Sequence, residues 1–132
     1  MTRINPPELP EPSGFSHAVV APAGRTVYLA GQTALGEDGR IIGVDNVVAQ
    51  FDRALAALVT ALAAAGGSPA HLVQVTIYIV DVPGYRARAR EIGEVWRRWC
   101  GTDYPAAAGI GVTRLWDDDA LVEIAGVAVI PG

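Results

Sequence analysis

The chain has 132 residues, a length that suits one domain with a substantial core. Its net charge of −4 argues against a generic nucleic-acid binder, which is normally basic. Its single cysteine, Cys100, excludes an internal disulfide and a cysteine-based metal cluster. Because 51% of the residues are hydrophobic, we expect surplus apolar surface to be buried against copies of the same chain.

Residues 1–14 contain four prolines and no apolar core, so they predict an extended arm of the single domain 1–132 and not a signal peptide. A flexible tail and a strand-like arm laid on the domain both remain open. No apolar run is expected to reach the roughly 18–20 residues that a membrane helix needs. The expectation is a cytosolic protein without a membrane partner.

Two β-rich runs, residues 15–22 and 25–31, are separated by Ala23-Gly24, an arrangement that predicts a β-hairpin. Turn-forming residues at 35–40 follow, and Ile41-Ile42 predict a short strand or bridge.

The next segment has the spacing of an amphipathic helix, with Asp45 as the N-cap and Gly66-Gly67 as the stop. After it, residues 72–80 alternate in a way that predicts a strand with one fully apolar face and one mixed face. The apolar positions of the predicted helix are Val47, Val48, Phe51, Leu55, Leu58, Val59 and Leu62.

A second helix is predicted to begin at Asp81-Val82-Pro83, a cap followed by an early proline, and to end at Gly101. Arginine and glutamate are mixed along its outer face, a pattern typical of a solvated helix surface. Its inward stripe is predicted to consist of Tyr85, Ala89, Ile92, Trp96 and Trp99.

The last stretch predicts two strands, residues 109–114 and 120–130, joined by an acidic turn at residues 116–119. The complete order is two strands, a short strand, a helix, a strand, a helix and two strands. This order predicts an α/β (α+β) sandwich in which a mixed β-sheet carries two helices on one face. The other face of the sheet would carry apolar residues, which we expect another subunit to cover.

Glu123 stands out because it lies inside the apolar final strand, while the run after Pro105 offers no polar side chain across from it. An unpaired buried carboxylate is costly, so it must meet a cation, a donor, water or a ligand. A structural ion pair and a ligand cleft are both open explanations. In a cleft, the carboxylate could act as a general acid or base. The residues predicted to share its face are Leu121, Ala125, Val127 and Val129.

The other chemistry-bearing residues carry weaker signals. The triplet 117–119 reads as a solvated turn, because no spaced set of partner oxygens accompanies it, and Arg114 is expected to pair with that turn. Cys100 reads as an inert buried thiol, and His71 as a surface residue. His17, at the start of a predicted strand, is a minor candidate for lining a site.

Six segments together resemble one known family over most of the chain, from about Pro6 to Ile130. The segments are SGFSHAV, VYLAGQ, AAAGG, VTIYIVD, YPA and LVEIAGVAVI. The chain resembles the Rid family, also called the YjgF-like or reactive-intermediate deaminase family and formerly L-PSP endoribonuclease. The resemblance implies a chorismate-mutase-like subunit, assembled as a homotrimer with ligand clefts between neighbouring subunits.

The resemblance also implies an activity. The best-known members hydrolyse enamines and imines of amino acids to 2-keto acids and ammonia, with no metal and no organic cofactor. In them an arginine grips the substrate carboxylate, and an acidic residue on the last strand helps to position the attacking water.

This chain matches the family pattern only in part. Glu123 matches the acidic position, and Gly31-Gln32 match the glycine-glutamine pair after the second strand. Ala107, however, stands where the arginine is expected. The remaining implied substrate-binding positions are Ala30 in place of a serine, Gly109 in place of a small polar or thiol residue, Ala89 in place of an asparagine, and Phe15 or His17 in place of an aromatic hydroxyl.

Because these site residues are replaced, above all the arginine at position 107, we expect a divergent member of the family with little activity on the usual 2-iminoacids. The favoured interpretation is an inter-subunit cleft that binds a small, neutral or cationic, largely apolar molecule through Glu123. The alternative is a non-catalytic, chaperone-like trimer. Ribonuclease activity is least favoured, because the chain is acidic and lacks interleaved aromatic and basic residues.

Overall fold

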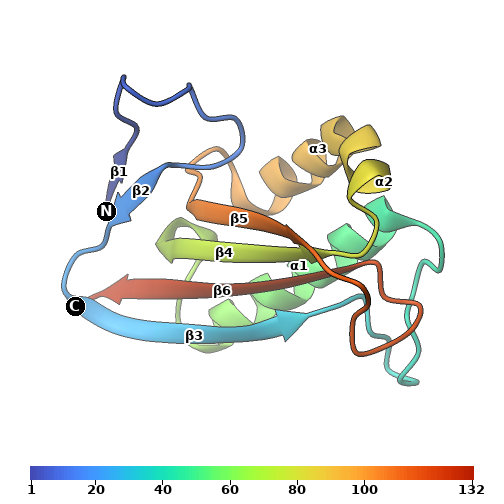
Figure 1. The fold of residues 1–132 in the computed structure, drawn as a ribbon. Helices are drawn as coiled ribbons and strands as arrows, with labels where there is room; N and C mark the ends of the chain where they lie inside the picture. The colour runs from blue at the N-terminus through green and yellow to red at the C-terminus, as the bar shows by residue number, and fades with distance from the viewer.

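A four-stranded mixed sheet forms the centre of the computed structural model, which describes residues 1–132 (Figure 1). The strand order is β3-β6-β4-β5; β6 is antiparallel to both neighbours, whereas β4 and β5 are parallel. The strands are β3 (Gly24–Gln32), β4 (Leu72–Ile79), β5 (Ala106–Gly111) and β6 (Val122–Pro131).

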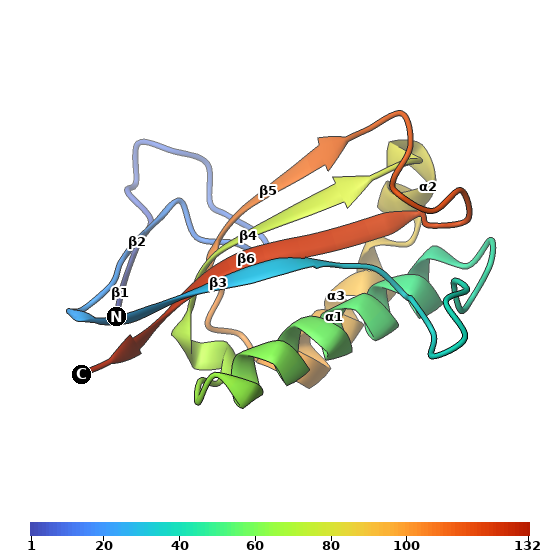
Figure 2. The same cartoon turned by 90° about the horizontal axis from the view of Figure 1, so that it is seen from below.

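Helices cover one face of this sheet only (Figure 2). They are α1 (Val47–Ala64), α2 (Val82–Ala87) and α3 (Ala89–Cys100), with a short 3-10 turn, η1 (Pro69–His71), before β4. The predicted fold class, a mixed sheet with its helices on one face, is confirmed. The second predicted helix is divided into α2 and α3 at Arg88, so the count of helices is three.

Helix α1 supplies the largest share of the core, because its apolar residues recur at helical spacing and point at the sheet. Phe51, Leu55, Leu58 and Leu62 are each at most 1% exposed. By length and composition alone α1 could span a membrane, contrary to the expectation from the sequence, yet in this fold it is a core helix. Its N-cap is Asn46, whose Oδ1 accepts from the Ala49 N–H at 3.0 Å; the prediction of Asp45 was wrong.

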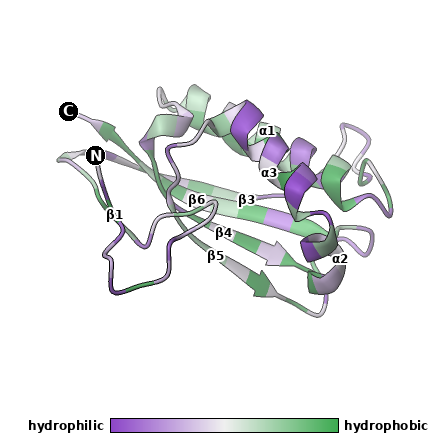
Figure 3. Ribbon diagram, turned by 90° about the horizontal axis from the view of Figure 1, so that it is seen from above, coloured by the Kyte–Doolittle hydropathy of each residue, from purple (hydrophilic) through white to green (hydrophobic).

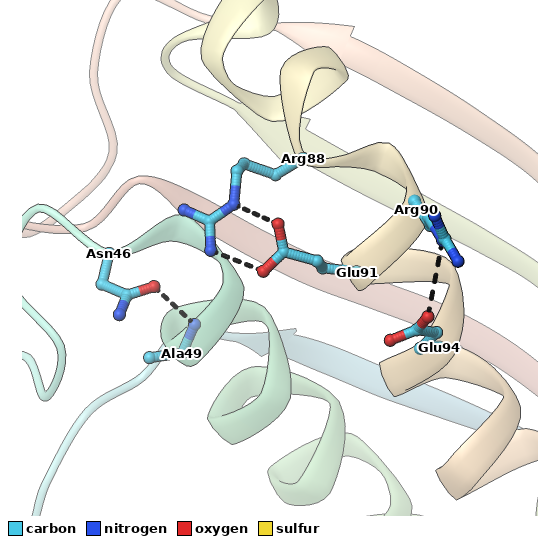
Figure 4. A network of polar contacts seen from close by, with 6 residues as sticks. All are labelled: Asn46, Ala49, Arg88, Arg90, Glu91 and Glu94. Atoms are coloured by element: carbon cyan, nitrogen blue, oxygen red, sulfur yellow. Dashed lines mark hydrogen bonds and ion pairs between the residues drawn. The ribbon is translucent and has the colours of Figure 1, made fainter.

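The charged face of α3 is solvated, as predicted. Arg88 forms a bidentate pair with Glu91, and Arg90 lies 3.8 Å from Glu94 (Figure 4). Exposed pairs of this kind stabilise a helix only slightly. The inward stripe differs from the prediction, because Val95 is buried whereas Ala89 and Trp99 are exposed.

The second face of the sheet has no helix over it. Cross-strand neighbours on this outer face include Tyr28 with Val127 and Tyr78 with Glu123, and Tyr28 is 81% exposed. The strands are largely hydrophobic or neutral in colour in Figure 3, whereas α3 carries hydrophilic segments. Ile110 of β5, which pairs with Tyr78, is also exposed on this face, so the uncovered, largely apolar sheet face expected from the sequence is present in the subunit.

The predicted hairpin at Ala23-Gly24 was wrong. Residues 18–20 form β2 (Ala18–Val20), which pairs with β1 (Thr2–Ile4) in a separate small sheet, so the arm is partly strand-like. Gly24 begins β3 and lies against the end of β6, where a Cβ would fall on the Ile130 carbonyl oxygen. The glycine is therefore explained by a close strand contact and not by a turn.

The last two strands are not neighbours, contrary to the arrangement drawn from the sequence. Strand β4 lies between β5 and β6. Strand β5 also begins earlier than predicted, at Ala106, so the alanine run lies within it. Strand β6 begins at Val122, which leaves Leu121 outside the row that contains Glu123.

Candidate functional site

Glu123 lies on the outer, helix-free face of the sheet. It is directly opposite Tyr78 of β4 and is half-buried. Its carboxylate makes no hydrogen bond and no ion pair within the chain, and Arg114, the arginine nearest in sequence, pairs with Asp118 instead. The structural ion pair considered from the sequence is therefore not present in the subunit.

Strand β3 bends beside this carboxylate. The β3–β6 register shifts between Leu29 and Gln32, which leaves one extra residue in β3 and indicates a β-bulge. At Gly31 in the bulge, a Cβ would lie 2.7 Å from Oε2 and 2.8 Å from Cδ of Glu123. A glycine at position 31 is thus what allows the carboxylate to lie flat against the backbone of β3.

The loop between β5 and β6 lies beside the Glu123 carboxylate. Arg114 bonds the Leu115 and Trp116 carbonyl oxygens at 3.1 and 3.3 Å and pairs with Asp118 at 2.7 Å, as the sequence suggested. Trp116 is 90% exposed. Together with Leu115, these side chains and Glu123 line an open hollow of about 570 Å³.

Gln50 of α1 fixes the end of that loop and was missed from the sequence. It is fully buried, and its Nε2 donates to the Asp119 carbonyl at 2.9 Å and to the Gly43 carbonyl at 3.1 Å. Its Oε1 accepts from the Leu121 N–H at 2.8 Å. Because Leu121 is two residues before Glu123, Gln50 positions the start of the strand that carries the carboxylate.

Ala107 and Gly109 face the opposite way. Ala107 packs against the helix-side core, and a Cβ at Gly109 would contact Ile79 Cδ1 at 3.6 Å. At Gly111, two residues farther along the same face, a Cβ would meet Val82 of α2 at 3.0 Å. Within one subunit these residues therefore do not lie across from Glu123; the sheet separates them.

Ala89, at the start of α3, is also on the helix side. It lies on the wall of a cavity of about 470 Å³ between the helices and Tyr104. Tyr104 also lines a second hollow, of about 580 Å³, against the N-terminal segment. Phe15 lies in that second hollow.

His17 is held by its own segment. Its ring packs edge-on against Phe15, with the ring centres 5.2 Å apart, and its Nε2 lies 2.8 Å from the Pro10 carbonyl oxygen. The backbone N–H of His17 donates to Asn5 Oδ1 at 2.8 Å. These contacts tie the proline-rich arm to β2.

The site residues expected from the sequence thus form two groups in the subunit. Glu123, Ala30, Gly31 and Gln32 lie along β3 and β6, whereas Ala89, Ala107 and Gly109 lie on the helix side with Phe15 nearby. Cys100 belongs to neither group; it packs against the core, and burial raises the pKa of its thiol to about 12.

Comparison with known proteins adds an independent line of information. The model of the family described as Endoribonuclease L-PSP matches residues 8–130. Protein DfrA of Myxococcus xanthus is 32% identical over 115 residues, which cover 87% of this chain and 84% of that protein.

Solved structures agree with this match. The Rid-family protein YyfB from Yersinia pestis, described as of unknown function, superposes with a TM-score of 0.86 at 35% identity over 98% of both chains. Rv2704 of Mycobacterium tuberculosis, described as a YjgF/YER057c/UK114 family member, gives a TM-score of 0.65 at 34% identity over 89% of this chain and 87% of that one. The chain therefore belongs to the endoribonuclease L-PSP family, known also as the Rid or YjgF family.

Proposed function

We propose that this protein is a homotrimer whose inter-subunit clefts bind a small, neutral or cationic, largely apolar molecule, with Glu123 as the main polar anchor. The observation that carries the proposal is the Glu123 carboxylate, which is half-buried against Gly31 and has no partner in the subunit. Hydrolysis of an imine or enamine, with Glu123 as acid and base, is the chemistry that such a group supports best.

The arrangement of the two residue groups supports a cleft between subunits. Glu123 and Ala107 point to opposite faces of one sheet, so they can share a cleft only when they come from different chains. The apolar outer face offers the surface on which a second chain can pack, because no helix covers it.

The charge around Glu123 supports a neutral or cationic ligand. Arg114, the arginine of the adjoining loop, is paired with Asp118, and Ala107 carries no charge. An anionic ligand would therefore meet an uncompensated carboxylate, whereas an amine, imine or amide could donate a hydrogen bond to it.

Assembly through the outer face predicts that a single charge will disrupt it. Wild-type protein is expected to elute with three times the chain mass of 13.8 kDa in light scattering coupled to size exclusion. Val127→Asp, opposite the exposed Tyr28, should shift the mass toward one chain, because it places a charge in an apolar interface. Thr60→Asp, on the exposed side of α1, is the control and should leave the mass unchanged.

The anchoring role of Glu123 predicts a loss of ligands on neutralisation. In a thermal-shift screen of small amines, amides and imine analogues, compounds that raise the Tm of wild type should raise the Tm of Glu123→Gln far less. The expected loss of affinity is about tenfold or more. Glu94→Gln removes an exposed carboxylate of α3 and should keep every hit. Identical hit lists for wild type and Glu123→Gln would show that Glu123 does not anchor the ligand.

A non-catalytic, chaperone-like trimer is the second candidate. It is favoured by the absence of reactive side chains at Ala30, Ala89, Ala107 and Gly109. This candidate predicts a trimer that binds no compound in the same screen.

A further inference from the structure

Trp116 has a position that its exposure alone does not explain. It is the most exposed of the large hydrophobic side chains, at 90%, and it lines the hollow that contains Glu123. A single hydrophobic residue on a surface is ordinary. A tryptophan beside a half-buried carboxylate that has no partner in the chain is a more specific arrangement, because both groups can contact the same ligand.

The loop that carries Trp116 is held in place on both sides of the indole. Arg114 donates to the Trp116 carbonyl oxygen at 3.3 Å and pairs with Asp118 at 2.7 Å. Farther along, Gln50 donates to the Asp119 carbonyl oxygen at 2.9 Å. The backbone of Trp116 is therefore fixed before any ligand arrives, which lowers the entropic cost of binding against its ring.

The charge of this region favours a cation. Residues 114–123 carry four carboxylates and one guanidinium, and that guanidinium, on Arg114, is paired with Asp118. Glu123 is the one carboxylate that lines the hollow. The face of an indole ring is also electronegative, so Trp116 and Glu123 both attract positive charge and both disfavour an anion.

We propose that Trp116 and Glu123 together select an organic cation, namely an ammonium or iminium ion that has no carboxylate group. The cation would lie against the indole face of Trp116, and its N–H would donate to the Glu123 carboxylate. Leu115, the remaining residue of the hollow, would contact the apolar body. This inference rests on the function proposed above, and it narrows the ligand from neutral or cationic molecules to cations.

The test compares isopentylammonium with isopentanol, an uncharged molecule of nearly the same shape, in titrations of the complete protein followed by NMR. Wild type should bind the ammonium ion about ten- to a hundredfold more tightly. Trp116→Leu should lower that preference by about three- to thirtyfold, whereas Trp116→Phe, which keeps an aromatic face, should retain most of it. Trp99→Leu, on α3 and outside the hollow, is the control and should leave the preference unchanged.

A second measurement needs no functional variant. The indole N–H signal of Trp116 in a ¹H–¹⁵N spectrum of wild type, assigned through Trp116→Phe, should shift with the ammonium ion, while that of Trp99 should not. Absence of a preference for the ammonium ion in wild type, an unchanged preference in Trp116→Leu, or an unmoved Trp116 signal at saturation would each overturn the inference.

Glu123→Gln separates this inference from the proposed function on which it rests. If Glu123→Gln weakens both probes while Trp116→Leu changes neither, Glu123 anchors the ligand and Trp116 has no part in its selection. If Glu123→Gln binds both probes as tightly as wild type does, the anchoring role of Glu123 is itself contradicted.

Discussion

Hydrolysis of 2-iminopropionate by this protein is expected to be about ten- to a hundredfold slower in kcat/KM than by a relative with the carboxylate-binding arginine. A charge-assisted arginine–carboxylate contact contributes on the order of 1.5–3 kcal/mol, and Ala107 cannot make it. Arg114 cannot replace it, because its guanidinium is paired with Asp118 and bonded to two loop carbonyls. The measurement is a steady-state assay with freshly generated iminopropionate.

The control is the same relative with its arginine changed to alanine, which should fall to the level of this protein. Turnover by wild type close to that of the unmodified relative would contradict the prediction. If that turnover then disappeared in Arg97→Gln, the carboxylate contact would come from Arg97, an exposed arginine of α3 without an ion pair, in place of β5. The two outcomes separate a lost activity from a relocated anchor.

The fold class could be predicted from the sequence because it depends on local periodicity. The helical spacing of Phe51, Leu55, Leu58 and Leu62 and the alternation in residues 72–80 both describe how one element faces the core. The partner of each strand is not local information. Periodicity could not show that β4 lies between β5 and β6, or that β2 pairs with β1.

The same limit applies to the candidate site. The sequence singled out Glu123 and the missing arginine at Ala107, but it placed them across from each other. The face of each residue follows from its partner on β4: Glu123 is opposite Tyr78, and Ala107 is opposite Val75. Because Val75 and Tyr78 are three residues apart in one strand, their side chains point to opposite faces, and so do those of Ala107 and Glu123. Two strands that are separated by a third can present such residues to opposite sides of the sheet.

Gln50 was overlooked because a glutamine in a helix is usually on the solvated side. Its helical neighbours at positions 54 and 58 are both buried, so the spacing did contain the signal that position 50 faces the core. What the sequence lacked was the partner. The loop groups that Gln50 binds are 69 and 71 residues away.

Replacement of this side chain is expected to be among the most destabilising single changes in the domain. Gln50→Leu should lower the free energy of unfolding by about 2–4 kcal/mol, because it leaves the Leu121 N–H and the carbonyls of Gly43 and Asp119 without their buried partner. Urea unfolding at fixed protein concentration gives the measurement, since assembly makes stability concentration-dependent.

Arg53→Leu is the control for this substitution. The Arg53 side chain is exposed on the same helix, away from the outer face of the sheet, and makes no hydrogen bond or ion pair, so its replacement should change the free energy of unfolding by within about 0.5 kcal/mol. A Gln50→Leu protein as stable as Arg53→Leu would mean that water replaces the buried amide without cost. If the loss of stability is found, ligands that depend on Glu123 should weaken too, because Gln50 holds the residue that leads into β6. Native Gln50→Leu protein that binds those ligands as tightly as wild type would show that Gln50 acts on stability alone and does not position Glu123.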